Sequence, residues 1–96
     1  MEDNRGDTKQ LSMLQEMLRR YCREHGQDVL ESYSKLTWLQ DDGTRLVIYK
    51  RPMILMGNGM YLYGEIDYSD SRPFRYLGEE AAEHLYKMLV ERLKEQ

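Results

Sequence analysis

The sequence predicts a single α+β domain in which one helix precedes an antiparallel meander and a second helix closes the chain. Three observations favour this fold. Apolar residues recur at steps of three and four near both ends, Asp42-Gly43 and Asn58-Gly59 are hairpin-turn dipeptides, and the segments around these turns alternate in polarity. We expect both helices to cover one face of the sheet, with residues 8–96 forming the domain after a flexible N-terminus at 1–7.

The first helix is expected over residues 8–25. Asp7-Thr8-Lys9-Gln10 has the pattern of a capping box, in which the two outer side chains satisfy amides of the first turn. Gly26 stands where a left-handed residue ends a helix. The apolar stripe of period 3.6 between these ends consists of Leu11, Leu14, Met17, Leu18, Tyr21 and Cys22. Cys22 is therefore expected to be a buried, structural thiol.

The middle of the chain predicts three long strands, or four if one of them divides. The first covers Val29–Leu39, and its alternation places Leu30, Leu36 and Trp38 on one face. The second starts at Thr44 and bends at Pro52, which has no amide hydrogen to donate. The third covers Met60–Tyr68, with Tyr61 and Tyr63 on the face that points away from the helices.

Residues 69–77 are polar and aromatic and contain Pro73, which predicts a loop. The second helix is expected to run from near Gly78 to Lys94. Glu79 and Glu80 suit the positive end of its dipole. Its apolar stripe consists of Ala81, Ala82, Leu85, Met88, Leu89 and Leu93.

Composition restricts the chemistry. One cysteine and two histidines among 96 residues predict neither an internal disulfide nor a Cys/His zinc site. No phosphate-binding loop or nucleophile elbow is present, and Glu80 with His84 is expected to be a solvated i,i+4 pair. We therefore expect no enzymatic activity, no cofactor and no metal. The longest apolar run, Met53–Met56, is far shorter than the ~20 residues of a membrane span, so the predicted location is cytoplasmic.

The outer face of the sheet is the candidate binding surface, because aromatic and cationic residues interleave on it. Tyrosine and arginine are enriched at the hot spots of protein interfaces, and methionine adapts to varied partners. We therefore expect a small regulatory module that binds a protein through this face or through the Met-rich hairpin. The candidate partner-binding residues are Tyr33, Arg45, Tyr49, Arg51, Ile54, Met56, Tyr61 and Tyr63.

Nucleic-acid binding by the same face is the alternative hypothesis, because rings can stack on bases while cations meet phosphates. The helix–strands–helix order is similar to that of double-stranded RNA-binding domains. Those domains open their second helix with a lysine cluster, whereas this chain has the acidic segment Gly78–Glu83 there. Acidic residues on the outer face and a net charge of −3 also favour a protein partner.

Self-association is a further prediction. Met53-Ile54-Leu55-Met56 is apolar without alternation, so two of its four side chains should point away from the core. A second copy of the chain could cover them, and we expect a homodimer through this segment.

Overall fold

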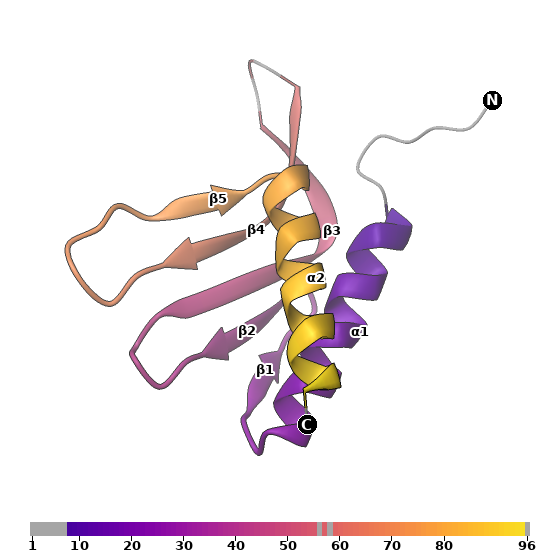
Figure 1. Cartoon of the computed structure of the whole chain (residues 1–96). Coiled ribbons are helices and arrows are strands. Elements are labelled where there is room, and N and C mark those ends of the chain that lie inside the picture. The colour runs from indigo at the N-terminus through magenta and orange to yellow at the C-terminus, as the bar shows by residue number, and fades with distance from the viewer. Residues whose placement is uncertain (1–7, 56, 58, 96) are drawn as a thin grey trace.

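The chain forms two helices and one antiparallel sheet of five strands in the part that the computed structural model describes, which comprises residues 8–55, 57 and 59–95 (Figure 1). In chain order the elements are α1 (Thr8–Glu24), β1 (Val29–Glu31), β2 (Lys35–Leu39), β3 (Arg45–Leu55), β4 (Met60–Asp67), β5 (Arg75–Leu77) and α2 (Glu79–Lys94). Each strand pairs with the next one along the chain, in the order β1-β2-β3-β4-β5. The predicted α+β fold and its helix–meander–helix order are confirmed.

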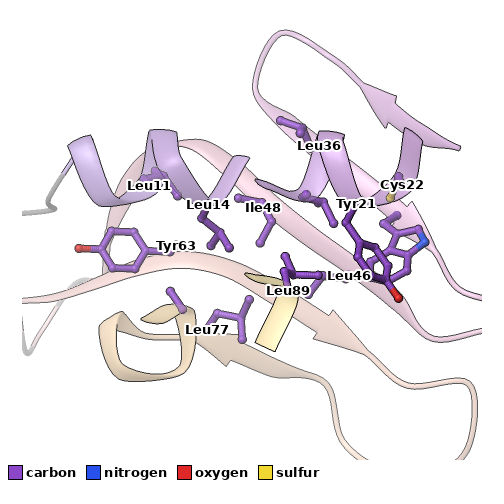
Figure 2. Packing of buried hydrophobic residues seen from close by; sticks show 13 residues of the cluster. Leu11, Leu14, Tyr21, Cys22, Leu36, Leu46, Ile48, Tyr63, Leu77 and Leu89 are labelled. Carbon is purple, nitrogen blue, oxygen red and sulfur yellow. The ribbon is translucent and has the colours of Figure 1, made fainter. Parts of the chain in front are cut away.

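Both helices pack on the same face of the sheet, as expected. On that face Leu36 of β2 lies opposite Ile48 of β3, and Trp38 lies opposite Leu46. These four side chains join one buried cluster with both helices (Figure 2). The helices contribute Leu11, Leu14, Leu18, Tyr21, Cys22, Ala82 and Leu89 to that cluster. We call this side of the sheet the helix face.

The opposite side, which we call the outer face, is defined by one row of residues that crosses all five strands. Leu30 pairs with Thr37, Thr37 with Val47, Val47 with Glu65, and Glu65 with Tyr76. No helix covers this row among the described residues (Figure 1). The exposure of this row is uneven, because Leu30 and Tyr76 at its two edges are 70% and 47% exposed whereas Val47 in the middle is 5% exposed.

The first predicted strand is divided by a tight turn, which is one reason for the fifth strand. The Ser32 hydroxyl accepts hydrogen bonds of 3.3 Å from the amides of Ser34 and Lys35, and the Ser32 amide donates to the Lys35 carbonyl at 2.8 Å. A short polar side chain thus competes with the ladder and folds the chain back.

This turn changes which face the residues before it occupy. Val29 lies opposite the buried Trp38, so the neighbouring Leu30 points to the outer face. The prediction that Leu30 shares a face with Leu36 and Trp38 is wrong, because the turn interrupts the alternation on which it depended.

The other additional strand lies in the predicted loop at residues 69–77. β5 pairs with β4 from Leu77 opposite Gly64 to Arg75 opposite Ile66. Tyr76 and Leu77 suit a strand, but only three residues pair, which is too few for alternation to be visible beside Pro73.

The turn at Asp42-Gly43 is confirmed. Gly43 has a φ of 91°, and the Asp42 carboxylate accepts a 2.8 Å hydrogen bond from the Thr44 amide. Gly26, with a φ of 66°, follows α1 as expected. The capping residue Asp7 and the predicted flexible segment 1–7 lie outside the described residues.

β3 continues through Pro52, as predicted, but its pairing with β4 is irregular there. Ile48 pairs with Gly64 and Met53 pairs with Leu62, so residues 49–52 of β3 stand opposite Tyr63 alone. Gly64 permits this arrangement, because a Cβ atom at that position would collide with the carbonyl oxygen of Val47. Such a bulge bends its strand and redirects the side chains around it.

As a result, Leu62 and Tyr63 exchange the sides of the sheet that regular alternation would give them. Only 1% of Tyr63 is exposed, and its ring lies in the helix-face cluster that also contains Leu11 (Figure 2). Leu62 packs instead with Val47 and Tyr49. The prediction that Tyr63 belongs to the outer face is therefore wrong, because β3 has three more residues than β4 between these two pairs and the regular alternation is interrupted there.

Beyond the bulge, β3 and β4 form a two-stranded hairpin that projects from the body of the domain (Figure 1). We call residues 53–62 the hairpin arm. Met53 pairs with Leu62 and Ile54 with Tyr61, which confirms the predicted hairpin, whereas Asn58 itself lies outside the described residues. Its exposed side chains include Met53, Ile54 and Met60, at 48%, 54% and 48%.

Candidate binding groove

A groove of about 600 Å³ lies where the outer face meets the base of the hairpin arm. Residues 33–35 of the β1–β2 turn form one wall, residues 49–53 of β3 form the other, and Glu65 of β4 completes the lining. The bulged residues of β3 are open on this side, because the last pair of β2 with β3 is Lys35 opposite Tyr49 and, beyond the hydrogen bond between Lys50 and Ser34, no described residue pairs with β3 there. We call this site the groove.

The backbone of the groove is fixed at two points. The Lys50 amide donates a 2.8 Å hydrogen bond to the Ser34 carbonyl, which ties the two walls together. The Tyr49 carbonyl accepts a 2.8 Å hydrogen bond from Nε2 of Gln15, a buried side chain of α1. A bulged carbonyl that would lack a ladder partner is thus satisfied from the helix. Both contacts hold the groove in shape without a ligand.

Tyr49 forms the floor of the groove. It is 6% exposed, and its hydroxyl donates a 2.6 Å hydrogen bond to Oε2 of Glu65. Burial raises the pKa of Tyr49 well above that of free tyrosine, and the hydrogen bond to Glu65 raises it further. The hydroxyl therefore stays protonated at neutral pH and remains hydrogen-bonded to the Glu65 carboxylate.

The groove is lined by three cations, Lys35, Lys50 and Arg51, and only Lys50 forms an ion pair among the described residues. Nζ of Lys50 lies 2.6 Å from Oε2 of Glu31, which Nη2 of Arg19 also contacts at 2.8 Å. Both cations donate hydrogen bonds to Glu31 and lower its pKa to about 2, and the hydrogen bond from Arg19 has the larger effect. By contrast, Lys35 and Arg51 are exposed and form no side-chain ion pair within the described part of the chain. These two are available to a ligand.

Three of the predicted partner-binding residues line the groove: Tyr33, Tyr49 and Arg51. Tyr33 reaches it from the β1–β2 turn rather than from a strand, and it is 95% exposed. Two more, Ile54 and Tyr61, pair with each other in the hairpin arm.

The remaining three lie elsewhere. Nη2 of Arg45 forms a 2.7 Å ion pair with Oδ2 of Asp67, at the opposite end of β3 from the arm. Tyr63 is buried in the helix-face cluster and is unavailable to a partner. Met56 lies outside the described residues.

Two groups outside the list of predicted partner-binding residues complete the surface. Pro52, expected as a bend, and Met53, the first residue of the predicted self-association segment, line the groove. Phe74 and Tyr76 stand edge to face 4.9 Å apart beside Glu65, in the segment predicted as a loop. The one signal in the sequence for a strand at this position is that Tyr76 and Leu77, two residues that suit strands, follow each other.

The other candidate residues do not assemble a reactive centre. Cys22 is buried as predicted, and burial, with a smaller contribution from Asp28, raises the pKa of its thiol to about 11. Nδ1 of His25 lies 2.9 Å from the Tyr21 carbonyl at the end of α1, and His84 is exposed. Across the described residues, no cluster of three potential metal ligands occurs.

Neither helix in the described part of the chain is long and apolar enough to cross a membrane. Comparison of the chain with protein-family models, characterised proteins and solved structures gives no match.

Proposed function

We propose that this chain is a non-enzymatic module that binds a protein partner through the groove and the hairpin arm. The observation that carries the proposal is the position of the exposed apolar side chains. Met53 and Ile54 stand on a paired strand that leads directly out of the groove, about half exposed at 48% and 54%. Covering such side chains is favourable by roughly 25 cal/mol per Å² of apolar area removed from water.

The local charge distribution supports a protein rather than a nucleic acid. Glu65 lies in the groove, and Asp67 neutralises Arg45 on the same face. A surface for single-stranded nucleic acid would present an uninterrupted row of cations to the phosphates, and the chain as a whole carries a net charge of −3. Mixed charges around aromatic and apolar side chains are typical of protein interfaces.

The unpaired edge of β3 also indicates how the partner is recognised. An extended peptide that added a strand there would need a donor from every second residue of the edge. Pro52 has no amide hydrogen, so a continuous ladder along residues 50–54 is interrupted. Recognition therefore depends on side chains rather than on strand addition.

Affinity capture from a cell lysate, followed by mass spectrometry, tests the proposal with two variants. Ile54→Asp places a charge on the arm, and Leu39→Asp makes the same change at a 65% exposed position at the far end of β2. We expect Ile54→Asp to lose the captured protein at least about tenfold, equivalent to 1.4 kcal/mol. Leu39→Asp should retain it.

Equal recovery by Ile54→Asp and the wild type contradicts the proposal, as does recovery of nucleic acid in place of protein. Sedimentation equilibrium identifies a second copy of the chain as the partner. A dimer that Ile54→Asp dissociates assigns the arm to self-association and makes the protein partner another copy.

A further inference from the structure

We infer that the groove receives an acidic segment of the partner, with carboxylates against Lys35 and Arg51 and an apolar side chain against Tyr33 and Met53. This inference rests on the proposed function and specifies the chemistry of the partner. It does not follow from the apolar arm alone, because an arm of this kind would bind any complementary apolar surface.

The charge of the groove is opposite to that of the chain. Of the three cations in its lining, Lys50 is paired with Glu31, which leaves Lys35 and Arg51 against one acid, Glu65, whereas the whole chain carries a net charge of −3. A local excess of cations on an acidic molecule attracts an anion to that position and repels it elsewhere. The groove is thus complementary to negative charge.

The acid of the groove is hydrogen-bonded to a hydroxyl and forms no ion pair with the groove's cations. Oε2 of Glu65 accepts the hydrogen bond of the Tyr49 hydroxyl at 2.6 Å, and no ion pair joins Glu65 to Lys35 or Arg51 in the described structure. Elsewhere on the outer face, by contrast, Arg45 is neutralised by Asp67. The groove therefore keeps two cations that are in no ion pair among the described residues, and they exceed its one carboxylate by a single positive charge.

These cations lie on a fixed backbone and beside apolar surface. Lys35 pairs directly with Tyr49 across the two walls, and Arg51 follows the residue whose amide ties the walls together. Tyr33 and Met53 border them with an exposed ring and a thioether. A guanidinium binds a carboxylate through two parallel hydrogen bonds, and it does so more strongly where neighbouring apolar side chains exclude water. An acidic segment with an aromatic or long apolar residue would place carboxylates against the two cations and its apolar side chain against Tyr33 and Met53.

Selection from a displayed library of random peptides tests this inference and needs no identified partner. The selecting proteins are the wild type, the double variant Lys35→Glu/Arg51→Glu, and the control Arg75→Glu/Arg92→Glu. The control makes the same change in net charge at two exposed cations outside the groove. Circular dichroism verifies that each variant is folded.

We expect the wild type and the control to select peptides in which aspartate or glutamate flanks an aromatic or long apolar residue. Synthetic peptides of that kind should bind the groove variant at least tenfold more weakly, and raising the salt concentration should weaken wild-type binding.

Selection of neutral or basic peptides, or of no peptide, overturns the inference, and so does equal loss of binding by the control. Single-stranded oligonucleotide binding that depends on Lys35 and Arg51 would assign the groove to nucleic acid and overturn it as well. If Ile54→Asp releases a captured partner that Lys35→Glu/Arg51→Glu retains, the proposed function stands and this inference alone fails.

Discussion

The two faces of the sheet are covered very differently, although the same strands form both. On the helix face, both helices and the strands contribute to one large buried cluster. On the outer face only Val47, Tyr49 and Leu62 are buried together among the residues that the structure describes. One meander thus supplies the stability of the fold from one side and presents a surface from the other, and the hairpin arm extends that surface beyond the helices (Figure 1). Stability and binding are therefore expected to respond to different substitutions.

The contrast is sharpest within β4, where Leu62 and Tyr63 are adjacent in sequence and packed in different clusters. Substitutions in and around β4 therefore measure whether the stability of the domain depends on the helix face more than on the outer face.

The largest effect is expected for Tyr63→Ala. Tyr63 is 1% exposed within the helix-face cluster, so removing its ring leaves a cavity and should lower the free energy of unfolding by about 3–5 kcal/mol. Urea denaturation followed by circular dichroism measures the loss. Tyr33→Ala is the matched control, because Tyr33 is 95% exposed and should change stability by less than about 0.5 kcal/mol. Similar losses in both variants would contradict the division between the faces.

A smaller loss is expected for Gly64→Ala, at a position of β4 where an added Cβ would meet the backbone of β3. The added methyl collides with the Val47 carbonyl, which belongs to backbone and cannot rotate away. We expect a loss of about 2–3 kcal/mol in the free energy of unfolding, because overpacking forces the backbone to shift.

Gly78→Ala is the control for that substitution. No atom lies within 4 Å of a Cβ built at Gly78, so its cost is limited to the weaker N-cap of α2, at most about 1 kcal/mol. If Gly64→Ala is no more costly than Gly78→Ala, the close approach of β3 and β4 is not required by the fold.

The smallest effect is expected on the outer face, for Tyr49→Phe. This change removes the hydrogen bond to Glu65, whose side chain is only half-buried, and should cost about 1 kcal/mol at neutral pH.

The pH dependence gives this prediction a second measurement. Burial and the hydrogen bond raise the pKa of Tyr49 above its ordinary value of 10.0, so the folded state favours the protonated hydroxyl. Its contribution is intact below pH 10.0 and is lost as the pH rises beyond that value. The wild type should therefore lose stability above pH 10.0 more steeply than Tyr49→Phe. Parallel curves for the two proteins would show that Tyr49 is not buried as described.

The fold was largely predictable because its local patterns agree with its tertiary structure. The stripes that contain Leu14 and Leu89 predict both helices, and Gly43 predicts its turn. The errors arise where a period of two residues is interrupted. The Ser32 turn reversed the face of Leu30, and the bulge opposite Tyr63 reversed the face of that ring. Alternation records which residues share a face only while the pairing is regular.

The site was less predictable than the fold, because it is produced by the irregularity itself. Lys35 and Arg51 belong to different strands, and the bulge that leaves residues 49–52 of β3 opposite Tyr63 alone has no signal in the sequence. Gln15, which fixes the bulged carbonyl, is a polar residue beside the apolar stripe of α1. Nothing in the sequence distinguishes it from a solvated glutamine, because its partner is a backbone carbonyl 34 residues further along the chain.

The number of strands also has a consequence for the ends of the chain. Each antiparallel strand reverses the direction of the polypeptide, so an odd number of strands between two helices makes those helices run the same way. Both helices accordingly begin at the end of the molecule from which the hairpin arm projects (Figure 1). A tag or surface linker attached beyond Lys94 is therefore carried at the end opposite the arm. Immobilising the protein by its C-terminus leaves the arm open to partners, whereas a bulky fusion before Thr8 starts at the same end as the arm.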